Sequence, residues 1–128
     1  MLSINVKETH FSQGEIIFED HNHLKSTSNS IYYITDGSIE IYPELKKKNI
    51  SNNILLNKLK NGESFGEWGF ITGNGRKASA KAHSYSQLYE LRRIDFLDAL
   101  TQFPNDFELF YELRDNLIFN ENRLKFVN

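Results

Sequence analysis

Phe65-Gly66-Glu67-Trp68-Gly69-Phe70, followed after a short gap by Arg76-Lys77-Ala78-Ser79-Ala80, is the stretch of this chain that says most about its fold. Glycine lets backbone N–H groups approach an anion, and a helix that starts at a glycine directs its positive end towards that anion. Arginine offers a charged fork to phosphate oxygens, and glutamate accepts hydrogen bonds from hydroxyls. The stretch therefore predicts a site for a small ligand that carries both sugar hydroxyls and a phosphate. The alternative is a hairpin turn with a Glu–Arg pair at the surface.

Short strands separated by turn residues are expected on both sides of this stretch, over residues 1–91. The segment 38–42 alternates in the manner of a half-buried strand, and Asp36-Gly37 before it is typical of a hairpin turn. Evenly spaced short strands of this kind indicate a β-sandwich or jelly roll. The expected strands are residues 14–18, 30–34, 38–42, 54–59, 78–83 and 88–91.

Helical periodicity begins at about Ile94. Residues 95–100 have helical spacing, and Pro104 is expected to end that helix, with Asn105 or Asp106 near the start of the next one. The predicted fold class is mainly β with C-terminal helices. We expect one domain over residues 1–128, with a β-roll at about 3–92 and helices at about 94–125.

Composition narrows the class of protein. The 128 residues include no cysteine, so a reducing cytosol is the expected compartment, and the net charge of −2 argues against nucleic-acid binding by charge alone. No apolar run approaches the roughly 20 residues needed to cross a bilayer, and the N-terminus lacks the apolar centre of a signal peptide. We therefore expect a cytoplasmic chain that does not itself insert into a membrane.

The order and spacing of Gly66, Glu67, Arg76, Ala78 and Ser79 resemble the phosphate-binding cassette of the cyclic nucleotide-binding domain family. The resemblance extends from residue 4 to about residue 120. Segments 11–18, 31–34 and 37–42 resemble the family's opening strands, while 88–91, Asp95-Phe96 and Phe103-Pro104 resemble its ion-channel branch. The resemblance implies an antiparallel β-roll with a short cassette helix and a lid helix, holding cAMP or cGMP.

The resemblance also implies roles for single residues. Arg76 would pair with the cyclic phosphate, Glu67 would accept from the ribose 2′-hydroxyl, and Gly66 and Gly69 would offer backbone donors. The ligand-binding residues expected on these grounds are Phe65, Gly66, Glu67, Trp68, Gly69, Arg76, Lys77, Ala78, Ser79, Leu117 and Ile118.

For four of these residues the expected role can be stated more specifically. Ala78 would keep the wall of the site small, and Ser79 would lie beside the phosphate. Lys77 stands where many cGMP-preferring and channel domains have threonine, and an ammonium group cannot accept from the guanine amino group, so cAMP should bind at least as tightly as cGMP. Trp68 is interpreted as a core or interface residue rather than one that stacks on the ligand.

The helix that begins near Pro104 is expected to be a mobile lid. Leu117 and Ile118 would close over the purine with hydrocarbon, or would only pack against the β-roll or the preceding helix. We expect this movement to gate a cation channel, so the partners would be the rest of that channel or neighbouring subunits. A kinase-regulatory cAMP sensor is an alternative, although Gly75 occupies the place where that branch usually has proline.

Other classes of function have less support in the sequence. His21-Asn22-His23 lies in a polar segment with no glutamate at the spacing of a cupin metal motif, so we expect no metal site and no cofactor. No Ser/His/Asp or Cys/His arrangement points to catalysis, so we expect a chain that is not an enzyme. The main rival is a β-roll that no longer binds nucleotide and acts as an interaction or assembly module.

Overall fold

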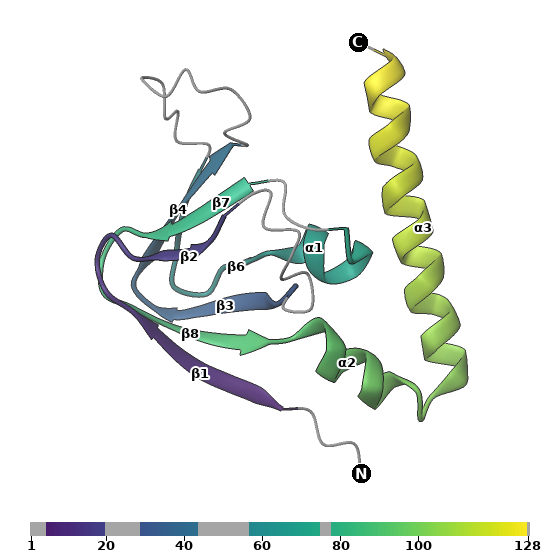
Figure 1. Cartoon of the computed structure of the whole chain (residues 1–128), viewed down its shortest axis with the longest axis horizontal. Coiled ribbons are helices and arrows are strands. Elements are labelled where there is room, and N and C mark those ends of the chain that lie inside the picture. The colour runs from purple at the N-terminus through teal and green to yellow at the C-terminus, as the bar shows by residue number, and fades with distance from the viewer. Residues whose placement is uncertain (1–4, 20–28, 44–56, 75–77, 128) are drawn as a thin grey trace.

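Two antiparallel sheets and three helices make up this chain in a computed structural model, which describes residues 5–19, 29–43, 57–74 and 78–127, with side chains as far as residue 120 (Figure 1). The elements, in chain order, are β1 Val6–Phe11, β2 Ile16–Phe18, β3 Ile31–Asp36, β4 Ser38–Pro43, β5 Asn57–Lys60, β6 Ser64–Phe65, α1 Glu67–Thr72, β7 Ala78–Ala82, β8 Ser86–Leu91, α2 Arg93–Leu100 and α3 Pro104–Val127.

The sheets face each other across one apolar core. One sheet has the strand order β1-β8-β3-β6 and the other has the order β2-β7-β4-β5. Ile34 and Leu88 point inward from the first sheet and Ile39 from the second, and all three side chains are fully buried. This arrangement confirms the prediction of a mainly β-roll fold with C-terminal helices.

The turn at Asp36-Gly37 is not a hairpin, so that prediction was wrong. β3 pairs with β6 and β8, whereas β4 pairs with β5 and β7, and the turn carries the chain from one sheet to the other. The N–H of Gly37 donates to Asn61 Oδ1 at 2.8 Å, and the N–H of Ser38 donates to Ser86 Oγ at 3.1 Å. Gly37 has φ 112°, and a Cβ there would lie 2.3 Å from Ser86 Oγ, so both conformation and space require glycine.

The other predicted elements lie within a few residues of their predicted bounds, and the structure contains two further strands that were not predicted. β1 was not among the predicted strands, because its sequence VKETHF lacks a clear apolar alternation and its residues are exposed or half-buried at the sheet edge. β6 is only two residues long and carries no pattern of its own. Residues 54–56 of the strand predicted at 54–59 lie outside the described part of the chain, and β5 begins at Asn57.

The C-terminal helices begin close to where the periodicity predicted. α3 starts at Pro104 itself, the first helical position, where a missing N–H costs no hydrogen bond. Figure 1 shows α3 standing beside α1 and α2. Phe70 of α1, Phe96 of α2 and Phe110 of α3 form an aromatic cluster with ring centroids 5.2 to 6.5 Å apart. The three helices therefore share one small core beside the β-roll.

Candidate ligand-binding site

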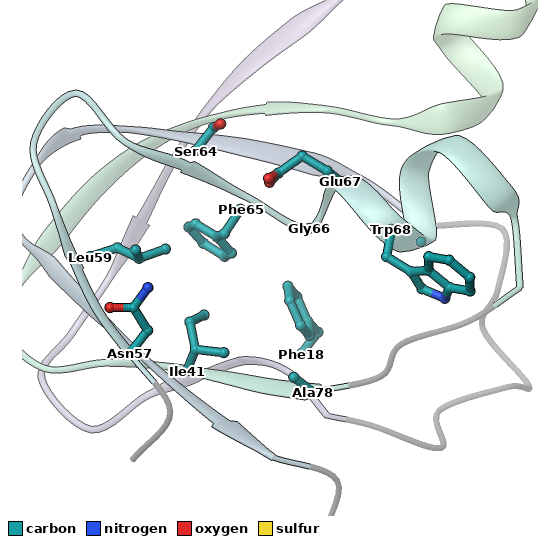
Figure 2. Close-up of a pocket in the computed structure, with 11 residues that line it drawn as sticks. Phe18, Ile41, Asn57, Leu59, Ser64, Phe65, Gly66, Glu67, Trp68 and Ala78 are labelled. Carbon is teal, nitrogen blue, oxygen red and sulfur yellow. The ribbon is translucent and has the colours of Figure 1, made fainter. Parts of the chain in front are cut away.

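A cavity of about 310 Å³ lies at the start of α1 and extends over the inner side of the second sheet (Figure 2). Its volume is at the lower end of the range of about 300–1,000 Å³ that is usual for ligand pockets. Strands β2, β4, β5, β6 and β7 and helix α1 all contribute to it. The lining residues are Phe18, Ile41, Asn57, Leu59, Ser64, Phe65, Gly66, Glu67, Trp68, Gly69 and Ala78.

Six of the eleven residues predicted to bind ligand line this cavity, namely Phe65, Gly66, Glu67, Trp68, Gly69 and Ala78. Ser79 follows Ala78 in β7, is buried, and is not part of the lining. Arg76 and Lys77 lie outside the described residues. Leu117 and Ile118 are half-buried on α3, and the structure does not bring them into the lining.

Gly66 shapes the entry to α1. Its φ of 90° is a left-handed conformation that glycine adopts without steric cost, and it turns the chain from β6 directly into the helix. The first intrahelical bond runs from the N–H of Phe70 to Gly66 O at 3.1 Å. The N–H groups of Glu67 and Gly69 precede that bond and take no part in the helix's own ladder. They are therefore placed to serve as donors at the cavity.

Glu67 is the only charged side chain among the described lining residues. It is exposed, and within the described part of the chain its carboxylate has no hydrogen-bond or ion-pair partner. Because it sits in the first turn of α1, the N-terminal end of the helix dipole favours its negative charge. An ionised carboxylate only accepts hydrogen bonds, so this wall of the cavity suits hydroxyl or amino groups of a ligand.

Aromatic rings form the floor of the cavity. Phe65 is 4% exposed, and its ring stacks on Tyr32 with centroids 5.1 Å apart and planes 13° from parallel. The Phe18 ring lies 5.9 Å from that of Phe65, and Figure 2 shows both rings directed into the space between the strands. The floor therefore offers apolar contact, which suits the flat or hydrocarbon parts of a ligand.

Five lining residues were not predicted: Phe18, Ile41, Asn57, Leu59 and Ser64. Inward alternation along the strands marks the three apolar ones as core residues, but it does not show which part of the core opens into a cavity. Trp68, which we predicted to be a core or interface residue, is half-buried at the edge of this cavity.

Other kinds of site have no support in the described residues. In that part of the chain, no group of three or more His, Cys, Asp or Glu side chains is placed to hold a metal ion. His21-Asn22-His23 lies outside it. Within the same residues, no helix combines the length and the apolar character needed to span a membrane.

Known proteins resemble this chain in sequence and in fold. A voltage-gated inwardly rectifying potassium channel of Rattus norvegicus, KCNH6, is 28% identical over 123 residues, a match that covers 89% of this chain and 12% of the channel. The chain thus spans only a small part of that relative. A catabolite activator protein of Thermus thermophilus superposes with a TM-score of 0.64 at 23% identity, covering 95% of this chain and 55% of that protein.

An EAL enzyme, Bd1971, in a half-site-occupied form, superposes with a TM-score of 0.66 at 22% identity, covering 92% of this chain and 99% of that one. These two structural likenesses show the fold. The family itself is shown by residues 8–103, which match the cyclic nucleotide-binding domain from within β1 to the residue before α3. This chain therefore belongs to the cyclic nucleotide-binding domain family.

Proposed function

We propose that this chain binds a cyclic nucleotide in the cavity at the start of α1 and acts as a regulatory domain. The observation that carries the proposal is the juxtaposition, around one cavity, of an uncommitted carboxylate, helix-start N–H groups and an aromatic floor. Glu67 would accept from the ribose 2′-hydroxyl, and Gly66 and Gly69 would face the phosphate with backbone donors. Phe65 and Phe18 would contact the apolar parts of the nucleotide.

Arg76 is the proposed partner of the cyclic phosphate. It precedes the lining residue Ala78 by two positions, and the described lining offers no cation of its own. Ser79, beside Ala78 in β7, is the proposed hydroxyl donor near the same phosphate. A guanidinium suits this role because its planar donors match the spacing of phosphate oxygens.

The proposed ligand preference is for cAMP over cGMP. Lys77 carries three donors and no acceptor, so it cannot receive a hydrogen bond from the guanine amino group as a threonine oxygen can. Lys77→Thr should raise the affinity for cGMP relative to that for cAMP. Calorimetric titration of both variants with both nucleotides measures this, and a strong cGMP preference in the unmodified chain would contradict the argument.

The proposed output is movement of the C-terminal helices, with Leu117 and Ile118 of α3 meeting the base. Support comes from the shared core of Phe70, Phe96 and Phe110, because a shift of α1 would displace the ring of Phe70 against that of Phe110 and so move α3. The likeness to KCNH6 supports a place in the cytoplasmic part of a cation channel, with the rest of that channel as partner. In this proposal residues 1–128 act as one domain.

Thermal unfolding with cAMP, cGMP and AMP side by side tests the central proposal. A ligand at a hundred times its dissociation constant stabilises a protein by about 2.7 kcal/mol. Both cyclic nucleotides should raise the melting temperature, whereas AMP, which lacks the cyclic phosphate, should do so far less. Arg76→Ala should weaken binding by about one to two decades, the equivalent of a hydrogen bond to a charged group. No shift with millimolar cAMP or cGMP would refute the proposal.

A second candidate function is an interaction module, which one observation favours. The outer face of the β1-β8-β3-β6 sheet carries a shallow apolar groove that includes Val6, Tyr33 and Tyr89, and these side chains are 53%, 46% and 44% exposed. Exposed aromatic residues of this kind are common at protein interfaces. A chain that ignores cyclic nucleotides but self-associates, and loses that association in Tyr89→Ser, would support this alternative.

A further inference from the structure

Arg93, the first residue of α2, makes a contact that reaches from the C-terminal helices into the cassette. Its Nε donates to the backbone carbonyl of Phe70 in α1 at 2.8 Å. Its guanidinium also lies over Gly73, the residue that ends α1, because a Cβ at Gly73 would be 2.9 Å from Arg93 Cζ. The side chain therefore covers the C-terminal end of the helix whose other end lines the cavity.

The preceding residue, Arg92, makes a different contact. Arg92, the N-cap residue of α2, pairs with Asp95 in the first turn of that helix, with Nε to Oδ2 at 2.8 Å and Nη2 to Oδ1 at 3.1 Å, and its side chain is 40% exposed. Arg93 has no carboxylate partner among the described residues, and its one hydrogen bond there is to a backbone carbonyl of another element. Arg92 therefore makes its contact at the N-terminal end of α2, whereas the adjacent Arg93 makes its contact between α2 and α1.

α1 needs external support because it is short. It has six residues, and isolated helices of fewer than about 12 are marginal in water. Its N-cap, Gly66, provides no side-chain cap. A cation at the C-terminal end of a helix is favourable, since the unpaired carbonyls there carry partial negative charge. Among the described residues, Arg93 is the side chain from another element that hydrogen-bonds the backbone of α1.

We propose that Arg93 is a positioning residue for the ligand site, which fixes α1 from its C-terminal end and so sets the place of Gly66 and Glu67 at the cavity. This rests on the proposed function, because the site it positions is the proposed nucleotide site. The cassette helix spans roughly 9 Å at 1.5 Å per residue, so a tilt at one end moves the other end as a rigid piece. Arg93 is not among the residues that line the cavity, so its proposed effect on the site is transmitted through α1.

The test compares Arg93→Ala and Arg93→Lys with the matched control Arg92→Ala, all in the full chain. Dissociation constants for cAMP and cGMP, melting temperatures and amide exchange of residues 67–73 without ligand are measured for each variant. Arg93→Ala should bind both nucleotides about three- to tenfold more weakly. This loss is smaller than the one to two decades expected when a charge-assisted hydrogen bond to the ligand itself is removed, because Arg93 acts on the ligand only through α1. Its exchange over 67–73 should be faster. Arg93→Lys, which keeps a donor but not the planar group over Gly73, should be intermediate.

Arg92→Ala should leave affinity within about twofold, even where it lowers the melting temperature as much as Arg93→Ala does. Unchanged affinity in Arg93→Ala, or equal losses in the two alanine variants, would overturn the proposal. If the unmodified chain binds neither nucleotide, the proposed function fails, and the exchange data then decide the positioning role alone. Faster exchange confined to residues 67–73 in Arg93→Ala supports that role, and exchange equal to that of Arg92→Ala overturns it.

Discussion

Replacing Glu67 by alanine should weaken binding of cAMP by about tenfold, and the structure allows this effect to be separated from damage to the fold. The carboxylate is exposed and has no partner among the described residues, so its removal breaks no contact there. Folding loses only the interaction of a first-turn acid with the helix dipole, about 0.3–1 kcal/mol. A hydrogen bond to a charged group is worth about 1.5–3 kcal/mol, and the exposed position favours the lower end of that range, which corresponds to about one decade.

The assay is a cycle of two proteins and two ligands, measured by titration calorimetry. The unmodified chain should bind cAMP about ten times more tightly than 2′-deoxy-cAMP, because the deoxy ligand lacks the hydroxyl that Glu67 is proposed to accept from. Glu67→Ala should bind the two ligands about equally, since the partner is already missing. Two changes to one interaction are not additive, whereas changes to independent interactions are.

Glu63→Gln is the control for charge. It removes a nearby exposed carboxylate that does not line the cavity and keeps an acceptor for the N–H of Lys60. Since cyclic nucleotides are anionic, losing any negative charge nearby should strengthen binding slightly, and Glu63→Gln measures that effect. Additive losses for Glu67→Ala and the 2′-deoxy ligand would refute the assigned pairing, and so would unchanged cAMP affinity in Glu67→Ala.

Three further predictions concern the packing around the site. Phe110→Ala should lower the free energy of unfolding in urea by about 3–5 kcal/mol, because this ring is buried against rings of α1 and α2. Leu113 is 48% exposed on the same helix, so Leu113→Ala should lower it by less than about 0.5 kcal/mol. Equal losses in the two variants would contradict the shared helical core. Gly37→Ala should cost more than Gly14→Ala in the same assay, since both have positive φ but only Gly37 lacks room for a Cβ. Ending the chain after Asn116 should weaken nucleotide binding while leaving the β-roll folded, and unchanged affinity would make α3 a scaffold rather than a lid.

Local signals in the sequence predicted much of the fold and the part of the cavity lining that β6 and the start of α1 provide. Gly66 and Glu67 could be placed because the glycine and the helix start that follows it are adjacent in the sequence. The change from strand to helical period near Ile94 was equally local, and α2 begins at Arg93. Predictions of this kind need no knowledge of distant partners.

Features that depend on distant partners could not be predicted. Asp36-Gly37 has the same local sequence whether the next strand folds back in one sheet or crosses to the other. Only the pairing of β4 with β5 and β7 decides between these outcomes. Phe18 could be expected in a core, but its place in the cavity depends on how the two sheets pack. Arg92 and Arg93 are indistinguishable in the sequence, and only the position of α1 separates their contacts.

Amide chemical-shift mapping with cAMP tests the central claim most directly, because it reports both whether the nucleotide binds and where. We predict that titration of the isotope-labelled chain shifts the amide signals of Gly66, Glu67, Gly69 and Ala78, with equal concentrations of AMP having little effect. The absence of shifts at millimolar cAMP, or shifts confined to the outer sheet face around Tyr33 and Tyr89, would contradict the account.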